Sequence, residues 1–261
     1  MTHSTDPRDY QLLPPALAVM AKRFPDGSRI PLHSHQRDQL IYATAGVMRI
    51  ETRVDAWVVP PDRALFMPAG IAHQIDVRGD LEMRTLYIAP SASAEVKVLT
   101  VSPLLRELIA ALAREPMDYS GNRRAEQIAD LIATELTWAA ALPLNIPLPR
   151  DERLQQICQR LLHDPSITLS LDQLAADAAV SSKTLARLCR EEMGMTFADW
   201  RRRVRFAKAL ELLGRNQPMK LVARACGYES PSAFTFAFRK EFGTSPAKLR
   251  DLGSRGSTDT R

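Results

Sequence analysis

The sequence predicts an α+β protein with two parts, in which a β-rich N-terminal part with two following helices precedes an all-α C-terminal part. Between residues 25 and 90, short apolar clusters alternate with turn residues, which is typical of a β-sandwich or β-barrel. From residue 102 onward, apolar residues recur at helical spacing. The 261 residues are 45% hydrophobic, which suffices for two modest domains and excludes a mainly disordered chain.

Charge is distributed unevenly between the two parts. Residues 1–150 hold 16 Lys and Arg against 17 Asp and Glu, a balance of −1, whereas residues 151–261 hold 19 against 13, a balance of +6. A basic part beside a neutral one is typical of a polyanion-binding unit joined to a unit with another task. A solvated helical surface accounts equally well for this excess, so charge alone leaves both interpretations open.

Several protein classes are excluded by simple patterns. No uninterrupted apolar run reaches the roughly 18 residues that a membrane span needs, so we expect no membrane partner. The N-terminus lacks a basic segment followed by an apolar stretch, which argues against export. Cys158, Cys189 and Cys226 are odd in number and widely spaced, which favours reduced, buried thiols. We therefore expect a cytoplasmic protein.

The β-rich part is predicted from clusters of apolar, β-branched and aromatic residues at 40–42, 47–50, 56–59, 64–67 and 86–88. Turns are predicted between these strands, at Pro25-Asp26-Gly27, Gly46, Pro60-Pro61, Pro68-Ala69-Gly70 and Arg78-Gly79-Asp80.

Two helices are predicted to follow the strands. Ser102 is placed to cap a helix with Pro103 at its first position, and a second helix is expected to start near Asn122. We expect these helices to form a dimer interface, or to cover one open face of the sheet. The proline-rich stretch at 143–150 is not compatible with a helix and predicts a stiff extended linker.

The C-terminal part is predicted to contain two helix pairs built on one plan. A short helix rich in small residues is followed by a brief turn and a capped second helix that ends at glycine, first around residues 174–194 and again around 221–243. Small side chains allow the close, steep helix crossing of a helix-turn-helix unit. A connecting helix of about 18 residues from Thr196 is ~27 Å long at 1.5 Å per residue. It can therefore hold two recognition helices near ~34 Å apart, one turn of B-DNA.

These helix pairs resemble the DNA-binding domain of the AraC/XylS transcription regulators. The resemblance rests on the stretch from Ser182 to Phe197 and on Gly227–Phe234 with the closing signature Phe238–Pro246, and it covers about residues 151–250. It implies that double-stranded DNA is the partner. Ala233 and Phe236 depart from the polar or basic residues that members often carry there, so we expect the first unit to discriminate most between sequences.

The resemblance also implies which residues contact DNA. The expected base-edge contacts are Lys183, Thr184, Ala186 and Arg187 in the first unit, and Ser232, Ala233, Thr235 and Phe236 in the second. The expected phosphate contacts are Ser181, Ser182, Ser230 and Arg239, together with helix-start amides. Arginine can bind guanine through two donors, and alanine can contact a thymine methyl group. The arginine-rich run at 201–205 is predicted to be the solvated face of the connecting helix rather than a base contact.

Three histidines form a second pattern in the β-rich part. His33 and His35 share one face if they lie on a strand, Gln39 follows four residues later, and His73 follows a turn. These residues resemble the two cupin motifs, with Gln39 where cupin enzymes usually carry Glu. Three imidazoles and an amide oxygen are suited to a divalent ion such as Zn²⁺, Ni²⁺ or Fe²⁺. The same histidines can instead be polar lining of a pocket. Further lining residues are expected at Tyr42, Trp57, Met67 and Arg84.

Together these patterns predict a cupin-like sensor barrel at 1–98, dimerisation helices at 99–142, the linker at 143–150, a double helix-turn-helix domain at 151–250 and a flexible tail at 251–261. The predicted function is transcription regulation by a homodimer that binds DNA and senses a small molecule or a metal ion, without catalytic activity. The alternative is a metal-dependent cupin enzyme, a dioxygenase or isomerase, with a helical appendage. A structural adaptor is the third interpretation.

Overall fold

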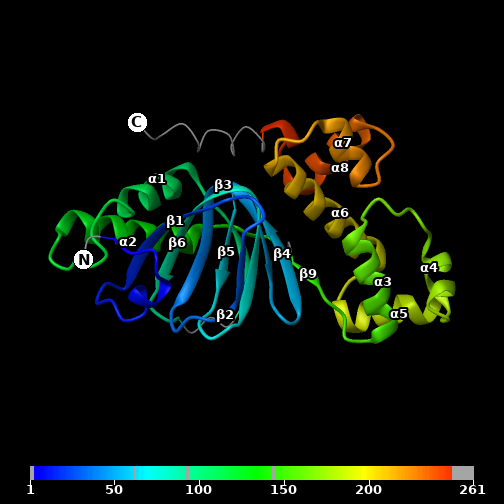
Figure 1. Ribbon diagram of the computed structural model, residues 1–261, viewed down its shortest axis with the longest axis horizontal. Helices are drawn as coiled ribbons and strands as arrows, with labels where there is room; N and C mark the ends of the chain where they lie inside the picture. The colour runs from blue at the N-terminus through cyan, green and yellow to red at the C-terminus, as the bar shows by residue number, and fades with distance from the viewer. Residues whose placement is uncertain (1–2, 62, 92–94, 143–144, 249–261) are drawn as a thin grey trace. The chain divides into compact units, whose positions relative to one another are not determined.

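The computed structural model describes residues 3–61, 63–91, 95–142 and 145–248. Contacts within the chain divide the protein into two compact units, and Figure 1 colours their elements by residue number. Of the described residues, the first unit comprises 3–50, 59–61, 63–91 and 95–142, and the second comprises 51–58 and 145–248. The predicted tail at 251–261 and residues 143–144 of the predicted linker lie outside the described residues.

The first unit is built on a curved antiparallel sheet (Figure 1). Its strands are hydrogen-bonded in the order β1-β6-β3-β5-β7-β8, and β2 pairs with β6. The strands are β1 (Leu17–Phe24), β2 (Arg29–His33), β3 (Asp38–Glu51), β5 (Arg63–Met67), β6 (His73–Ile88), β7 (Lys97–Thr100) and β8 (Ala141–Leu142), preceded by a short 3₁₀ helix, η1 (Pro7–Tyr10). Sheet first and helices afterwards confirm the α+β fold class.

The turns predicted at Gly46 and at Arg78-Gly79-Asp80 are wrong, because both segments lie within long strands. Gly46 lies inside β3 and Gly79 inside β6, with φ values of +77° and +76°. A Cβ atom on Gly46 would lie 2.7 Å from the carbonyl oxygen of Asp80, so the backbones of two neighbouring strands approach closely here. Glycine therefore permits a local irregularity within paired strands rather than a reversal of the chain.

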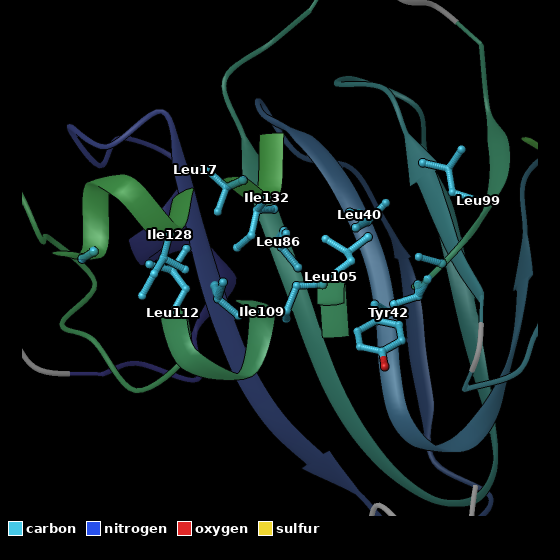
Figure 2. Packing of buried hydrophobic residues seen from close by; sticks show 14 of the residues in the cluster. Leu17, Leu40, Tyr42, Leu86, Leu99, Leu105, Ile109, Leu112, Ile128 and Ile132 are labelled. Carbon is cyan, nitrogen blue, oxygen red and sulfur yellow. The ribbon is translucent and has the colours of Figure 1, made fainter. Parts of the chain in front are cut away.

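Helices α1 (Pro103–Leu112) and α2 (Arg123–Trp138) begin where the sequence predicts. Ser102 caps α1 by accepting a hydrogen bond from the amide of Leu105, and Asn122 caps α2 in the same way. Figure 2 shows the apolar side chains of both helices meeting those of the sheet, among them Leu105, Ile109, Leu112, Ile128 and Ile132 facing Leu17, Leu40 and Leu86. Both helices thus cover one face of the sheet, as one of the two predicted roles requires.

The second unit contains strand β4 (Asp55–Val59) up to Val58, strand β9 (Ile146–Pro147) and six helices within its described residues. The helices are α3 (Glu152–His163), α4 (Leu171–Asp177), α5 (Ser182–Met193), α6 (Phe197–Gly214), α7 (Met219–Ala225) and α8 (Pro231–Phe242). The connecting helix α6 begins at Thr196 as predicted, with the Thr196 side chain accepting from the amide of Asp199. Helix α4 begins with a capping box between Ser170 and Gln173. Gly194 and Gly243 end α5 and α8 in the left-handed conformation, as predicted. The linker is extended at 146–147, where β9 pairs with β4.

Candidate functional site

The first helix pair, α4 and α5, exposes the residues expected to contact bases. Leu185, Leu188 and Cys189 of α5 are buried in the unit's apolar core. Lys183 and Arg187 lie on the opposite side and are exposed, and Thr184 and Ala186 are partly exposed. This arrangement follows from the helical period, which places Lys183 and Arg187 about half a turn from the buried set. The outer face of α5 is therefore polar, basic and accessible.

Several polar groups at this surface already have partners within the protein. The hydroxyl of Ser181 accepts a hydrogen bond from the amide of Thr184 at 3.1 Å, and the hydroxyl of Ser182 donates to Asp172. Arg187 Nη1 lies 2.6 Å from Glu191 Oε2, and both side chains are more than half exposed. Exposed ion pairs of this spacing contribute only ~0.3–0.5 kcal/mol, so Arg187 can exchange this partner for another at small cost.

The second helix pair, α7 and α8, repeats the arrangement with a more apolar outer face. Ser230 caps α8 by accepting from the amide of Ala233 at 3.2 Å. Phe234 and Phe238 are fully buried, whereas Phe236 is 75% exposed. The remaining expected contacts, Ser232, Ala233 and Arg239, are exposed, and Thr235 is partly exposed. An exposed aromatic ring on this face has no role in packing the unit's own core.

The expectation that the arginine run is a solvated face is wrong for three of its members. Arg201 donates to the carbonyl oxygen of Leu169 at 2.6 Å, Arg203 to that of Asn145 at 2.7 Å, and Arg205 to that of Pro165 at 3.2 Å. All three are partly buried, whereas Arg202 is exposed and pairs with Asp199 and Glu241. The sequence shows four arginines and no sign that guanidinium groups satisfy loop carbonyls, because those loops are distant in the chain.

A hollow of about 500 Å³ opens beside the run. It is bordered by the outer face of α5, the start of α6 and the turn between α7 and α8. Four arginines line it, Arg190, Arg201, Arg202 and Arg205, with Tyr228. Since many cationic groups around a concave surface attract anions, this hollow is suited to a polyanion.

The structure brings the three histidines of the first unit together. His33 lies at the end of β2, His35 follows it, and His73 begins β6 opposite His33 in register. The potential ligand atoms all lie within 4.8 Å of one another. The ring centroid of His33 is 4.9 Å from that of His35 and 4.4 Å from that of His73. A pairing of strands thus assembles a cluster from positions 40 residues apart.

The protonation of these imidazoles favours a ligand role. Burial, with a smaller effect of the neighbouring histidines, lowers the pKa of His73 and of His35 to about 4, so both rings are neutral at pH 7. Nδ1 of His33 donates to the carbonyl oxygen of Pro31 at 2.7 Å, and Nδ1 of His73 to that of Ile71 at 3.0 Å. Because carbonyls only accept, Nδ1 carries a proton in both rings, and the neutral form of each ring has its lone pair on Nε2. Nε2 of His73 is buried without a hydrogen-bond partner among the described residues.

Gln39 is connected to this cluster through Tyr87, which the sequence did not single out. The Tyr87 ring lies edge-on to His35, with centroids 5.2 Å apart. Burial strongly raises the pKa of Tyr87, and a hydrogen bond with Gln39 opposes this in part. Gln39 is itself buried and lies opposite Met67 in register. Tyr87 comes from the far end of β6, so no local pattern relates it to the histidine motif.

The four expected pocket residues do not form one group. Tyr42 packs in the core between sheet and helices (Figure 2), on the opposite face of β3 from Gln39. Arg84 shares the face of Leu86, which belongs to that same core. Met67 is buried on the face of Gln39, and Trp57 is buried on β4. Met67 thus lies on the sheet face that carries Gln39, whereas Tyr42 and Arg84 lie on the opposite face.

Comparison with known proteins defines the class. A model of the AraC-like ligand binding domain matches residues 14–136, and a model of a helix-turn-helix domain matches residues 174–251. The chain is therefore a DNA-binding transcription regulator with a ligand-binding domain. It is 30% identical over 221 residues to the HTH-type transcriptional regulator NimR of Escherichia coli, covering 84% of this chain and 81% of NimR.

The chain is also similar to two proteins at lower sequence identity. The HTH-type transcriptional activator RhaR of Pectobacterium carotovorum is 23% identical over 272 residues, which cover 93% of each chain. A crystal structure of the DNA-binding domain of AdpA with a target DNA is 27% identical, covering 42% of this chain and 100% of that one, with a TM-score of 0.39. This chain belongs to the AraC family of transcription regulators. Among the described residues, no helix combines the length and apolarity required to traverse a bilayer.

Proposed function

We propose that this AraC-family regulator reads two adjacent major-groove segments of one DNA duplex and that a divalent transition-metal ion in its first unit controls this binding. The single observation that carries the proposal is the pair of capped helices, α5 and α8, whose outer faces are exposed while their inner faces form the core. Recognition helices of helix-turn-helix units enter the major groove with such faces.

Base reading is assigned to the outer faces of α5 and α8. Arg187 supplies a bidentate donor for guanine, and Lys183, Thr184 and Ala186 adjoin it on the first face. The apolar side chains of Ala233 and Phe236 on the second face are suited to thymine methyl groups. Ser232 and Thr235 supply hydroxyls to the second face, and Ser181, Ser182, Ser230 and Arg239 supply phosphate contacts at the helix starts and last turn.

The proposed effector is a divalent transition metal, because the donor set is imidazole. Neutral imidazoles suit Zn²⁺, Ni²⁺ or Fe²⁺, whereas Mg²⁺ and Ca²⁺ require oxygen ligands. The buried Nε2 of His73, which has no hydrogen-bond partner among the described residues, supports an ion at that point. Gln39 is proposed as a fourth ligand or as a residue that orients the site through Tyr87. Ion binding alters DNA binding only by favouring one of two arrangements of the protein.

Two measurements test the proposal. A duplex selected by the full chain from a random library is titrated at several salt concentrations, and specific binding is expected to weaken steeply with salt and exceed binding to random duplex by at least about a thousandfold. Equal affinity for selected and random duplex would refute regulation by sequence.

The second measurement is equilibrium dialysis against Zn²⁺, Ni²⁺ and Fe²⁺, with the selected duplex then titrated in each ion. We expect one bound ion per chain, lost in His73→Ala, and a changed DNA affinity in the ion-loaded wild type. Equal ion content in both proteins refutes the metal site. Bound ion without a change in DNA affinity leaves a small molecule as the effector.

We also propose that the protein acts as a homodimer in the cytoplasm. Leu131 and Trp138 of α2 are 51% and 84% exposed and lie seven residues apart, on one face of the helix. Leu104 at the start of α1 is 55% exposed. A second copy of this chain is suited to cover such residues. Light scattering of the wild type should give a dimer and Trp138→Glu a monomer; an unchanged mass in the variant would place the interface elsewhere.

The proposed role requires no catalysis. The rival interpretation, a metal-dependent cupin oxygenase or isomerase, is supported by the histidine cluster alone. It makes a distinct prediction, since an oxygenase consumes dissolved oxygen when an organic substrate is added to its iron-loaded form. Substrate-dependent oxygen uptake that disappears in His73→Ala would favour the enzyme.

A further inference from the structure

The guanidinium group of Arg205 lies at the seam between the two helix-turn-helix units. Arg205 occupies the middle of α6, the helix that connects the pair α4–α5 with the pair α7–α8 (Figure 1). Its Nε donates to the carbonyl oxygen of Pro165 at 3.2 Å, and its Nη2 donates to that of Ile167 at 3.3 Å. Both carbonyls belong to the α3–α4 loop, which leads directly into the first helix-turn-helix unit.

The same guanidinium contacts the turn of the second unit. Its Cζ lies 6.0 Å from the ring centre of Tyr228. A Cβ atom on Gly227 would lie 2.7 Å from Arg205 Nη2, so the guanidinium packs directly against the backbone of Gly227. Gly227 and Tyr228 form the turn between α7 and α8. The Tyr228 ring also packs against Phe234 of α8, with centroids 5.5 Å apart.

The connecting helix α6 by itself does not fix the rotation of the two helix-turn-helix units about its axis. The first helix-turn-helix unit packs on the N-terminal half of α6, through Phe197, Trp200 and Val204. The second packs on later positions, where Phe206 contacts Phe238 and Phe242. A helix fixes the distance between two packed units along its axis, but their rotation about that axis depends on side-chain contacts. A group that contacts both units at once constrains this rotation.

We propose that Arg205 is a positioning residue that fixes the rotation of the two helix-turn-helix units about α6, and thereby the separation of DNA half-sites that the protein accepts. The planar guanidinium suits this task because it donates at its edge to two loop carbonyls while presenting its charge to the Tyr228 ring. This inference rests on the proposed two-site reading of DNA.

Arg201 provides a matched control on the same helix. It lies one turn before Arg205, borders the same hollow and donates to the same loop, at the carbonyl oxygen of Leu169. Its guanidinium stacks on Phe197, 4.8 Å from the ring centre. Both of these contacts belong to the first helix-turn-helix unit. Removing Arg201 therefore removes the same charge and a similar loop contact, but no contact with the second helix-turn-helix unit.

The test uses the full chain and a two-part duplex selected by the wild type from a random library. Affinity is measured for this duplex, for duplexes with one base pair inserted or deleted between the half-sites, and for a duplex with the second half-site scrambled. The wild type is expected to prefer the selected spacing about tenfold, since joined sites gain affinity only where the geometry permits simultaneous contact. In Arg205→Met this preference is expected to fall to about twofold. Affinity for the single half-site should fall by about the same factor as in Arg201→Met, because both variants remove one positive charge from the hollow.

Each outcome decides one question. Arg201→Met should keep the wild-type spacing preference, and an equal loss in both variants would overturn a specific role for Arg205. A full spacing preference in Arg205→Met also overturns it. The preference is a ratio of two affinities, so it does not depend on the folded fraction. If Arg205→Met does not fold, Arg205→Lys replaces it with the same expected result. Failure of the wild type to select any two-part duplex would instead refute the proposed function.

Discussion

Arg187→Ala offers the sharpest test of how the first helix-turn-helix unit reads DNA. In the free protein Arg187 pairs with Glu191 at 2.6 Å, both exposed. A bidentate arginine–guanine contact discriminates against a wrong base by ~1–3 kcal/mol. Breaking the ion pair offsets only ~0.3–0.5 kcal/mol of this. Replacement by alanine should therefore lower affinity for the selected duplex about tenfold, and remove the preference at one base pair.

The assay compares the wild type and Arg187→Ala on the selected duplex and on its single-base variants. Loss of discrimination at one position, with the others unchanged, assigns that base pair to Arg187. Glu191→Gln is the matched control, because it releases Arg187 without removing it, and should raise affinity by about twofold at most. A uniform loss across all duplexes, with a smaller salt dependence, would refute base reading and assign Arg187 to phosphate.

Three further predictions concern the fold. Gly46→Ala should destabilise the first unit by ~2–5 kcal/mol, because it combines a positive φ with overlap against a neighbouring backbone, and an unchanged urea midpoint would contradict the close approach. Ile109→Ala should cost ~2–5 kcal/mol in urea unfolding, since Ile109 is fully buried between α1 and the sheet, while the exposed control Leu12→Ala should cost under ~1 kcal/mol. Burial raises the pKa of Cys189 to about 11 and of Cys226 to about 12, so both stay protonated thiols at pH 8. A thiol reagent should then label the native protein slowly and all three cysteines after unfolding; rapid native labelling would contradict their burial.

The histidine cluster illustrates how a motif can be found while its surroundings remain hidden. Spacing in the sequence identified His33, His35 and His73, because their positions relative to a strand face and a turn can be inferred from the sequence. The sequence did not identify Tyr87 and Gln11 as their neighbours. Gln11 Nε2 lies 3.4 Å from His35 Nδ1, yet the two residues come from separate elements. Pairing of strands and packing of η1 against β1 decide such neighbours.

Local chemistry in the sequence determined the element types, the helix starts and the two similar helix pairs. Caps, prolines and helical periodicity act over a few residues, so Ser102, Ser181 and Ser230 could be identified as helix starts directly. The tertiary structure alone decided that Gly46 lies within a strand, that Tyr42 belongs to the helix-facing core and that Arg205 contacts both helix-turn-helix units. Each of these depends on groups from distant parts of the chain, whose approach is set by the packing of the whole unit.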